Sequence, residues 1–397
     1  MATALTDRLG RLFAALDRLS DRRAVLLLLA VGLLLAVPGL VLQGDPNSDG
    51  LFYEVQAKEL QGASHAQAMH EVFDSERARE AAAIEDEPSG AYRVLNPVWQ
   101  EFSAQFYERR WLVPGLAIGV GAVTGESVQT AVKTVSMLGY ALLGAMLFLL
   151  LRRRFGVATS IVGALGCLLL PPLYRWSFGQ FVDSWGLLLE TLGLLALVLV
   201  ADRGLRWLPL WIGAMLLLSI TRDATMILGI AAVWLAVAQW RNRDLLRRNA
   251  WILGAGAAAA FPALLLGGAP VQENLSYIYA GYNIPTDTSW AHVIAGYPDQ
   301  LWATIHGNLT YPLDRGKAGL VLYAVVAVAI AAIAFVVVRR PRGDTYWLTA
   351  HGAILGCVVL LLVANNPQGY RLELVFVPAI ATGFAIVLTR LQALSRR

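Results

Sequence analysis

Charged residues and cysteine are scarce in this chain of 397 residues. Only 15% of the residues are charged and two are cysteines, whereas 57% are hydrophobic. Cys167 and Cys357 both lie inside apolar runs, so neither is placed for a structural disulfide or a metal. The five histidines show no His-x-x-x-His spacing, which argues against a dedicated zinc site. The composition excludes an ordinary soluble domain.

The chain has instead a series of apolar runs separated by short basic segments. The first run, from Ala24 to Leu42, has 19 uncharged residues and is long enough to cross the hydrocarbon core as a helix. It is too long for a cleavable signal peptide, and no small-residue cleavage site follows it. Of the 32 basic residues, 20 fall in six short segments between the runs. The pI of 9.1 therefore reflects membrane topology, and no nucleic acid partner is expected.

The arginine-rich segments are expected to face the cytoplasm. This predicts an all-α polytopic membrane protein with about ten transmembrane helices and both termini cytoplasmic. The predicted spans are 24–42, 128–151, 157–173, 184–201, 207–220, 224–240, 250–267, 318–338, 346–363 and 371–389. The apolar piece from Leu112 to Gly125 is interpreted as re-entrant or interfacial, because an extra span would place the arginines at 152–154 outside.

Two loops of a single transmembrane domain, 1–397, are long, and both are expected on the non-cytoplasmic side. They cover 43–111 and 268–317. The first contains 13 acidic and 6 basic residues, and most of its acidic cluster from Glu71 to Glu87 is interpreted as solvated surface. No soluble domain with its own core is expected. Long ordered loops on one side are usually functional, so the active face should be extracytoplasmic, as for a periplasmic face of a bacterial inner membrane protein.

The first loop opens with Asp45-Pro-Asn-Ser-Asp49-Gly-Leu-Phe-Tyr53, just past the first apolar run. The apolar and polar residues that follow predict a short helix at the membrane surface, ending near Gly62. Two interpretations of Asp49 stay open. Asp49 or Ser48 caps this helix, or Asp49 is a general base or metal ligand that the helix N-terminus keeps ionised.

Other outward segments place charges at or near membrane depth. Arg93 could meet an anionic headgroup in a site, or reach lipid phosphate from the interface. Arg222 beside Asp223, and Arg371 near Glu373, are candidates for a polar pocket or for structural ion pairs. A further charged corner joins Arg175 to Asp183 at 174–183. The convergence of such charges on one side favours a pocket at the outward ends of the bundle.

In these features the chain resembles the GT-C class of membrane glycosyltransferases. The resemblance rests on the outward Asp49-Gly-Leu-Phe-Tyr53, the long first loop with surface helices, the Tyr92-Arg93-Val-Leu-Asn-Pro97 stretch and the late Tyr370-Arg371. It implies transfer of a sugar from a polyprenyl-phosphate donor to a glycan or glycolipid acceptor. A direct displacement would invert the anomeric configuration.

The resemblance also implies roles for individual residues. Asp49 takes the role of the catalytic carboxylate, with Asp45 as its rival, and the absence of a clear Asp-x-Asp pair leaves a divalent cation (Mg²⁺ or Mn²⁺) an open question. Arg371, Arg222 and Arg93 are the expected donor-phosphate ligands. Tyr53, His292 and Tyr370 are the expected substrate-binding residues; His292 lies among aromatic residues, which form an interface belt or stack on sugars.

The main alternative is a transporter or flippase of a lipid-linked or anionic substrate, in which the same charges would line a path. Transporters more often show internal repeats and charges near the bilayer midplane. Here only Glu190 falls well inside a predicted span. An acyl or phosphoryl transferase is a third possibility, but no histidine–aspartate motif supports it.

Overall fold

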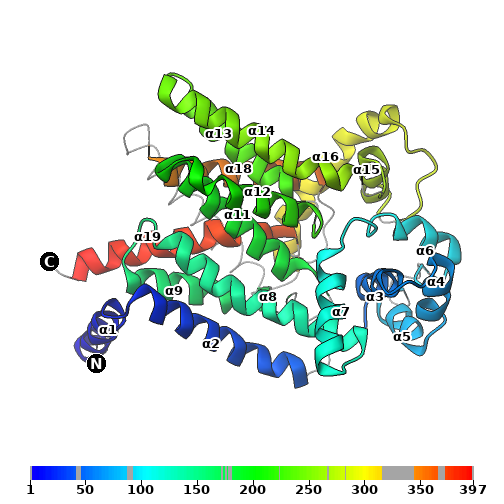
Figure 1. Ribbon diagram of the computed structural model, residues 1–397, viewed down its shortest axis with the longest axis horizontal. Helices are drawn as coiled ribbons and strands as arrows, with labels where there is room; N and C mark the ends of the chain where they lie inside the picture. Colours follow the sequence, from blue (N-terminus) through cyan, green and yellow to red (C-terminus); the bar gives the residue numbers. More distant parts are fainter. Residues whose placement is uncertain are drawn as a thin grey trace.

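The computed structural model is helical in every regular element that it describes (Figure 1). It describes residues 2–41, 46–86, 93–170, 173–174, 177, 181–222, 224–265, 268–281, 283–314, 344–364 and 372–395. The α-helices are α1 Ala2–Asp17, α2 Asp21–Val41, α3 Ser48–Leu60, α4 His65–Phe73, α5 Glu76–Glu85, α6 Pro97–Ala104, α7 Leu112–Thr124, α8 Val128–Leu151, α9 Val157–Leu168, α11 Asp183–Arg203, α12 Leu208–Ser219, α13 Thr225–Ala238, α14 Arg243–Leu265, α15 Val271–Tyr279, α16 Trp290–Asp314, α18 Thr345–Ala364 and α19 Val377–Ser395. The 3₁₀ turns η1 Leu205–Trp207 and η2 Leu372–Phe376 precede α12 and α19.

Four helical segments in the described part of the chain are long and apolar enough to cross a membrane. They are Val128–Leu151, Asp183–Arg203, Thr345–Val363 and Leu374–Ala393, and they match the predicted spans 128–151, 184–201, 346–363 and 371–389. The structure therefore indicates an α-helical membrane protein, as expected.

The other predicted spans are not established as crossings. Helix α9 has 12 residues, and at about 1.5 Å per residue it falls well short of a hydrocarbon core about 30 Å thick. Helices α12 and α13 are shorter apolar helices too. Helices α2 and α14 occupy the predicted spans 24–42 and 250–267, and 318–338 lies outside the described residues. The total of about ten spans stays a prediction.

Glycines allow the helices of the bundle to approach closely. Gly352 and Gly356, four residues apart on α18, face α13, where an added Cβ would lie 2.8 Å from the Cα atoms of Ala231 and Ile227. An added Cβ at Gly32 of α2 would come equally close to the backbone of α8. In lipid the hydrophobic effect does not drive helices together, so association depends on close van der Waals packing. Small residues at such crossings make that packing possible. Substituting either glycine on α18 would push the two helices apart.

The chain termini lie together at one end of the molecule, and helices α3 to α6 lie at the opposite end (Figure 1). At the terminal end, three consecutive arginines after α8 pair with aspartates of other segments: Arg152 with Asp21 at 2.8 Å, Arg153 with Asp202 at 3.9 Å and Arg154 with Asp344 at 3.4 Å. Asp17 of α1 accepts a hydrogen bond of 2.9 Å from the backbone N–H of Ala158 in the first turn of α9. The arginine segment after α8 thus lies at the end where the termini are.

Helices α3 to α6, together with the segments that connect them, form the first-loop module, residues 46–86 and 93–111. The module has an apolar core of its own, which makes the expectation that no loop would have one wrong. Its buried members are Leu51, Phe52, Val55, Ala68, Met69, Val72, Phe73, Ala78, Ala81, Ala82, Val94, Trp99 and Ala104. Helix α3 ends as predicted near Gly62, whose φ of +100° suits glycine. Helix α3 is largely buried within the protein, and its place at a membrane surface stays a prediction.

Helix α7 joins the first-loop module to the bundle. Its 13 residues are too few to span the hydrocarbon core, as the sequence analysis anticipated. Its first residue, Leu112, donates a backbone hydrogen bond of 3.2 Å to Ile220 at the end of α12, and Val113 and Ala117 are buried with residues of α8. The contacts place α7 against the protein, which fits either of the two proposed forms.

The second long loop docks on the first-loop module through α15. The backbone N–H of Gly268 donates to Glu108 at 2.7 Å, and that of Ala269 donates to the carbonyl of Gln105 at 3.1 Å. The ring of Tyr277 stacks on Phe106 with centroids 4.7 Å apart. The two loops therefore form one structure at the same end of the bundle.

Candidate functional site

Asp49 lies at the start of α3, where the first-loop module meets the bundle. The helix begins here because Asn47 has an extended backbone and its Oδ1 accepts a hydrogen bond of 2.9 Å from the N–H of Gly50. The interpretation of Ser48 or Asp49 as the cap is therefore wrong. Asn47 performs this function, so the Asp49 carboxylate is available for another.

Tyr107 is a partner of that carboxylate. Its hydroxyl donates a short hydrogen bond to Oδ1 of Asp49. Burial, together with the charge of Asp49, raises the pKa of Tyr107 well above its usual value, so the phenol stays protonated and keeps donating. A donor aimed at a carboxylate favours the ionised form. Asp49 is only partly buried, so its carboxyl group is held by Tyr107 and still partly exposed.

Aromatic rings and one arginine hold Tyr107. Phe52 stacks on its ring at 4.6 Å between centroids, and Tyr53 meets its edge at 5.4 Å. The guanidinium of Arg110 lies 4.7 Å from the ring centroid and donates to the hydroxyl of Tyr53 at 3.4 Å. Tyr53 is 0% exposed, and its expected role in substrate binding stays a prediction. Its side chain supports Tyr107.

Glu85 holds the first turn of α3 from a distance in sequence. Its two oxygens accept from the backbone N–H and from the hydroxyl of Ser48, at 2.8 and 2.7 Å. Burial, with smaller contributions from the charges of Asp49 and Asp86, raises the pKa of Glu85. Ser48, which precedes Asp49, is thus held in place by Glu85, a carboxylate whose ionised form is disfavoured by burial.

The described end of the acidic cluster is buried, whereas Glu71, Asp74, Glu76 and Glu80 are exposed, as expected for most of the cluster. Asp86 is 2% exposed and its Oδ2 accepts from the backbone N–H of Val94 at 2.6 Å. The Nε of Arg93 lies 3.7 Å from Oδ1 of Asp86, and its Nη1 donates to the carbonyl of Gly281 at 3.5 Å. Arg93 thus bridges the two long loops, with 24% of its side chain exposed.

Arg222 forms an ion pair with Asp183 at 2.6 Å, with side-chain exposures of 13% and 1%. Its expected neighbour Asp223 lies outside the described residues. The Cδ of Arg222 would be 3.1 Å from a Cβ at Gly186, so the missing side chain gives the arginine room along α11. Glu190 lies on the same face of α11, seven residues after Asp183, and is 1% exposed.

Asp49, Tyr107, Phe52, Tyr53 and Arg110 form a group called the Asp49 cluster below. The Arg222–Asp183 pair lies at the same end of the bundle as this cluster. Val182, next to Asp183, belongs to the same buried apolar cluster as Tyr53 and Val113. These contacts fit the predicted convergence of outward charges from separate segments.

The remaining expected site residues divide into two groups. His292 is exposed on α16 and lines a groove in the second long loop. Asp45, Tyr370 and Arg371 lie outside the described residues, as does the side chain of Glu373. Their assigned roles stay predictions.

In the part of the chain that the structure describes, no group of three or more His, Cys, Asp or Glu side chains is arranged to hold a metal ion. Asp45, the other carboxylate of the first-loop motif, is not in that part. A role for Mg²⁺ or Mn²⁺ therefore stays an open question. Cys167 and Cys357 are buried and unbridged, as expected.

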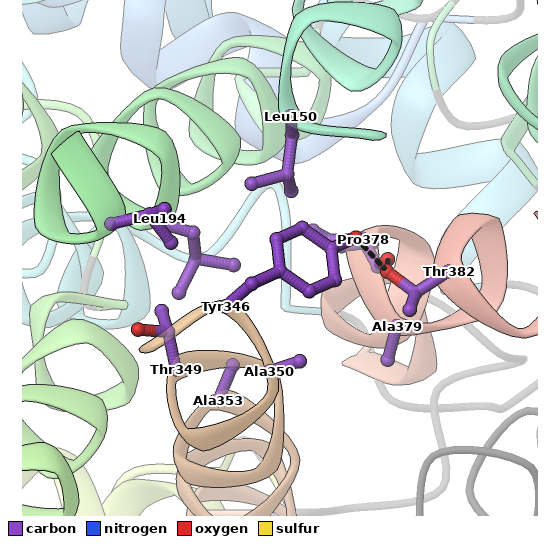
Figure 2. A pocket seen from close by; sticks show the side chains of 10 residues that line it. Leu150, Leu194, Tyr346, Thr349, Ala350, Ala353, Pro378, Ala379 and Thr382 are labelled. Carbon is purple, nitrogen blue, oxygen red and sulfur yellow. Dashed lines mark hydrogen bonds between the residues drawn. The ribbon is translucent and has the colours of Figure 1, made fainter. Parts of the chain in front are cut away.

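A small cavity between α8, α11, α18 and α19 is a packing gap rather than a site. Its volume of about 20 Å³ would admit a single water molecule. Figure 2 shows the ring of Tyr346 reaching across it to Thr382, with their hydroxyls 3.1 Å apart. The other lining side chains are largely apolar, and include Leu150 and Leu194. This region offers a ligand little space and few polar partners.

Sequence reasoning missed Tyr107, Arg110 and Glu85. The stretch Phe106-Tyr-Glu-Arg-Arg-Trp111 has the same polar and aromatic character as the stretch around Arg93, and that was a usable signal. Glu85 gave no such signal, because its partner Ser48 is 37 residues away. Comparisons with protein-family models, curated proteins and solved structures find no match for this chain.

Proposed function

We propose that this protein is a membrane glycosyltransferase of the GT-C kind. It transfers a sugar from a polyprenyl-phosphate donor to a glycan or glycolipid acceptor at the loop end of the bundle, on the extracytoplasmic side, with both termini cytoplasmic. The observation that carries the proposal is the Asp49–Tyr107 pair, a partly exposed carboxylate held by a half-buried phenol where the loops meet the bundle. A base for a lipid-linked sugar must stand at such a boundary, because the anomeric carbon lies at the membrane surface.

In the proposed reaction, an acceptor hydroxyl oxygen attacks the anomeric carbon of the donor. The bond from that carbon to the phosphate oxygen breaks, and the phosphate leaves with the electron pair. Asp49 takes the hydroxyl proton, and the configuration at the anomeric carbon inverts. Tyr107 keeps Asp49 ionised and oriented before the reaction, so less reorganisation is needed in the transition state.

The proposed phosphate ligands are Arg371, Arg222 and Arg93, which neutralise the charge on the leaving phosphate. Arg222 is already paired with Asp183 at 2.6 Å, so a phosphate there competes with a carboxylate or shares the guanidinium with it. Arg110 is a further cation beside Tyr107 that the sequence analysis did not assign.

A transporter remains the second candidate, because of Glu190. This carboxyl is 1% exposed, one of its oxygens has no hydrogen-bond partner among the described residues, and it shares a face of α11 with Asp183. Buried ionisable groups within spans commonly mark substrate or ion paths. A transporter would require Glu190 for function and would tolerate a neutral residue at position 49.

The test uses Asp49→Asn in the purified protein reconstituted in nanodiscs, with a panel of polyprenyl-phosphate sugars as donors. Loss of a general base costs about a hundredfold to ten-thousandfold in rate. Because Asn47 caps α3, the melting temperature should stay near that of the wild type. Asp74→Asn is the matched control, since Asp74 is an exposed carboxylate of the same module and should keep full activity.

The outcomes distinguish Asp49 from Asp45 as the catalytic base and test whether this loop supplies the base. Collapse of transfer in Asp49→Asn alone supports the proposal. Activity retained there and lost in Asp45→Asn moves the base to Asp45. If both variants keep full transfer activity, this loop does not supply the base and the glycosyltransferase proposal fails.

A further inference from the structure

The second long loop encloses a groove that the proposed reaction has not yet used. It lies between the end of α15, the segment that follows it and the first half of α16, and its volume is about 480 Å³. Volumes of about 300 to 1,000 Å³ are usual for small-molecule sites. The groove is more than twenty times larger than the packing gap in the bundle. Space for a ligand is therefore present at the loop end of the molecule.

The side chains that line the groove combine one aromatic ring with several planar or hydroxyl polar groups. Tyr279 supplies the ring, Asp299 a carboxylate, Gln300 an amide, His292 an imidazole and Thr286 a hydroxyl. A sugar ring has an apolar face of C–H groups, which packs on an aromatic ring, and a rim of hydroxyls, which pair with such polar groups. The described lining residues include no Lys or Arg, so this set suits a neutral saccharide better than a phosphate.

The aromatic ring is held in place. The hydroxyl of Tyr279 donates to the backbone carbonyl of Val363 near the end of α18, at 3.3 Å. Gly296 of α16 faces the ring, and an added Cβ there would be 3.8 Å from its Cδ2 atom. The glycine thus leaves one edge of the ring uncovered by a side chain. An immobilised tyrosine loses little conformational entropy when a ligand stacks on it.

Helix α15 connects the groove to the Asp49 cluster. Tyr277 and Tyr279 are two residues apart, about 200° around the helix, so they face opposite sides. Tyr277 is buried against the first-loop module and shares a hydrogen bond of 3.2 Å with Ser103. Burial raises the pKa of Tyr277 to about 12, and the charge of Arg93 lowers it while that of Asp49 raises it, so both groups lie within electrostatic reach.

The rim of the groove has a second connection to that cluster. Arg93, which pairs with Asp86, donates to the carbonyl of Gly281 in the segment that runs from α15 to the groove residues. The segment that leads from α15 to the groove therefore contacts the first-loop module through Arg93.

We propose that this groove binds the acceptor saccharide, as a neutral glycan chain of at least two sugar rings whose terminal hydroxyl is presented toward Asp49. The assignment rests on the proposed function for its role as an acceptor site, but the binding of a saccharide does not. Tyr279 stacks on one ring, and Asp299 and Gln300 hydrogen-bond to its hydroxyls. Specificity for the acceptor thus comes from the second long loop, and the chemistry from the first.

The test is saturation-transfer NMR on the full-length protein in nanodiscs, with maltose, cellobiose, mannobiose and chitobiose as probes. The wild type should transfer saturation to at least one disaccharide. Asp299→Asn should weaken its binding at least tenfold, because a charge-assisted hydrogen bond contributes about 1.5 to 3 kcal/mol. Glu273→Gln, on α15 outside the groove lining, is the control and should bind as the wild type does.

A second variant avoids any loss of a native interaction. Gly296→Leu adds a side chain over Tyr279 at an ordinary van der Waals distance, and leucine is a better helix former than glycine. The variant should fold normally and abolish saturation transfer. The proposal is overturned if the wild type shows no saturation transfer to any disaccharide. It is also overturned if saturation transfer is unchanged in both groove variants.

The two proposals can fail separately. The groove variants should lose saccharide binding, and Asp49→Asn should keep it. This result supports saccharide binding in the groove, whatever the transferase assay gives. Absence of transferase activity from every donor, with that binding pattern intact, removes the glycosyltransferase assignment and leaves a saccharide-binding groove. Full transferase activity in Gly296→Leu overturns the acceptor role of the groove and leaves the proposed role of Asp49 untouched.

Discussion

The ion pairs at the two ends of the bundle differ in how far their carboxylates are buried. At the end that carries the termini, Arg152, Arg153 and Arg154 each reach an aspartate, and both partners of every pair keep between 22% and 57% of their side chains exposed. At the loop end, the carboxylates of Asp183 and Asp86 are only 1% and 3% exposed, and each is paired with an arginine.

The difference follows from what each end has to do. Exposed ion pairs contribute about 0 to 1 kcal/mol, and arginines outside the hydrocarbon need no partner to orient a membrane protein. Burying a carboxylate costs several kcal/mol unless its partners are held in place. Several buried and paired carboxylates at one end of the bundle make a preorganised polar region there, which is typical of functional sites. The variants below test that contrast, from the largest expected effect to the smallest.

Removing a buried charge should cost far more than removing an exposed one. In Asp183→Asn the guanidinium of Arg222 loses its ion-pair partner in a largely buried place, and the expected loss is about 3 to 5 kcal/mol. Asp21→Asn at the terminal end should cost less than about 1 kcal/mol. Chemical unfolding in detergent, monitored by circular dichroism, gives both values. Equal losses would contradict the proposed contrast.

Removing one tyrosine hydroxyl should affect activity only at the loop end. Tyr107→Phe keeps the ring that stacks on Phe52 but removes the donor to Asp49. A hydrogen bond to a charged group contributes about 1.5 to 3 kcal/mol, which corresponds to roughly a tenfold to hundredfold lower kcat. Tyr140→Phe, which removes a hydroxyl bonded to the carbonyl of Leu168 in the bundle, should lower stability and leave kcat unchanged. Similar kcat values in the two variants would remove Tyr107 from the site.

The smallest expected effect is the pH dependence that Glu85 confers. Burial raises its pKa above the ordinary 4.5, so the folded state holds the proton more tightly than the unfolded state. Its stabilising contribution is complete below pH 4.5 and is lost as pH rises through the raised pKa. Relative to Glu85→Gln, the wild type should therefore lose stability as pH rises over this range.

Melting curves of the wild type and Glu85→Gln between pH 4 and 8 measure this difference. Other titrating groups are common to both proteins and cancel. A wild type that instead gains relative stability with rising pH would mean that the hydrogen bonds from Ser48 outweigh burial.

Some features could be predicted from local sequence because local sequence causes them. The uncharged length of Val128–Leu151 predicts a spanning helix. Gly62 predicts the end of α3 because few other residues adopt its positive φ. The cap of α3 was assigned to the wrong residue, because Asn47, Ser48 and Asp49 are all good caps and only the backbone angles decide among them.

The sequence by itself determined the class of protein, the position of the apolar segments, the segregation of arginine to the short connections and the place of Asp49 at a helix start. These depend on length, composition and nearest neighbours in the chain. Only the tertiary structure decided that Tyr107 donates to Asp49 across 58 positions, that Glu85 holds Ser48, and that Arg222 pairs with Asp183. The physical reason is that burial and partner choice depend on which helices pack together, and many residues along the chain could have supplied a hydroxyl, a carboxylate or an arginine.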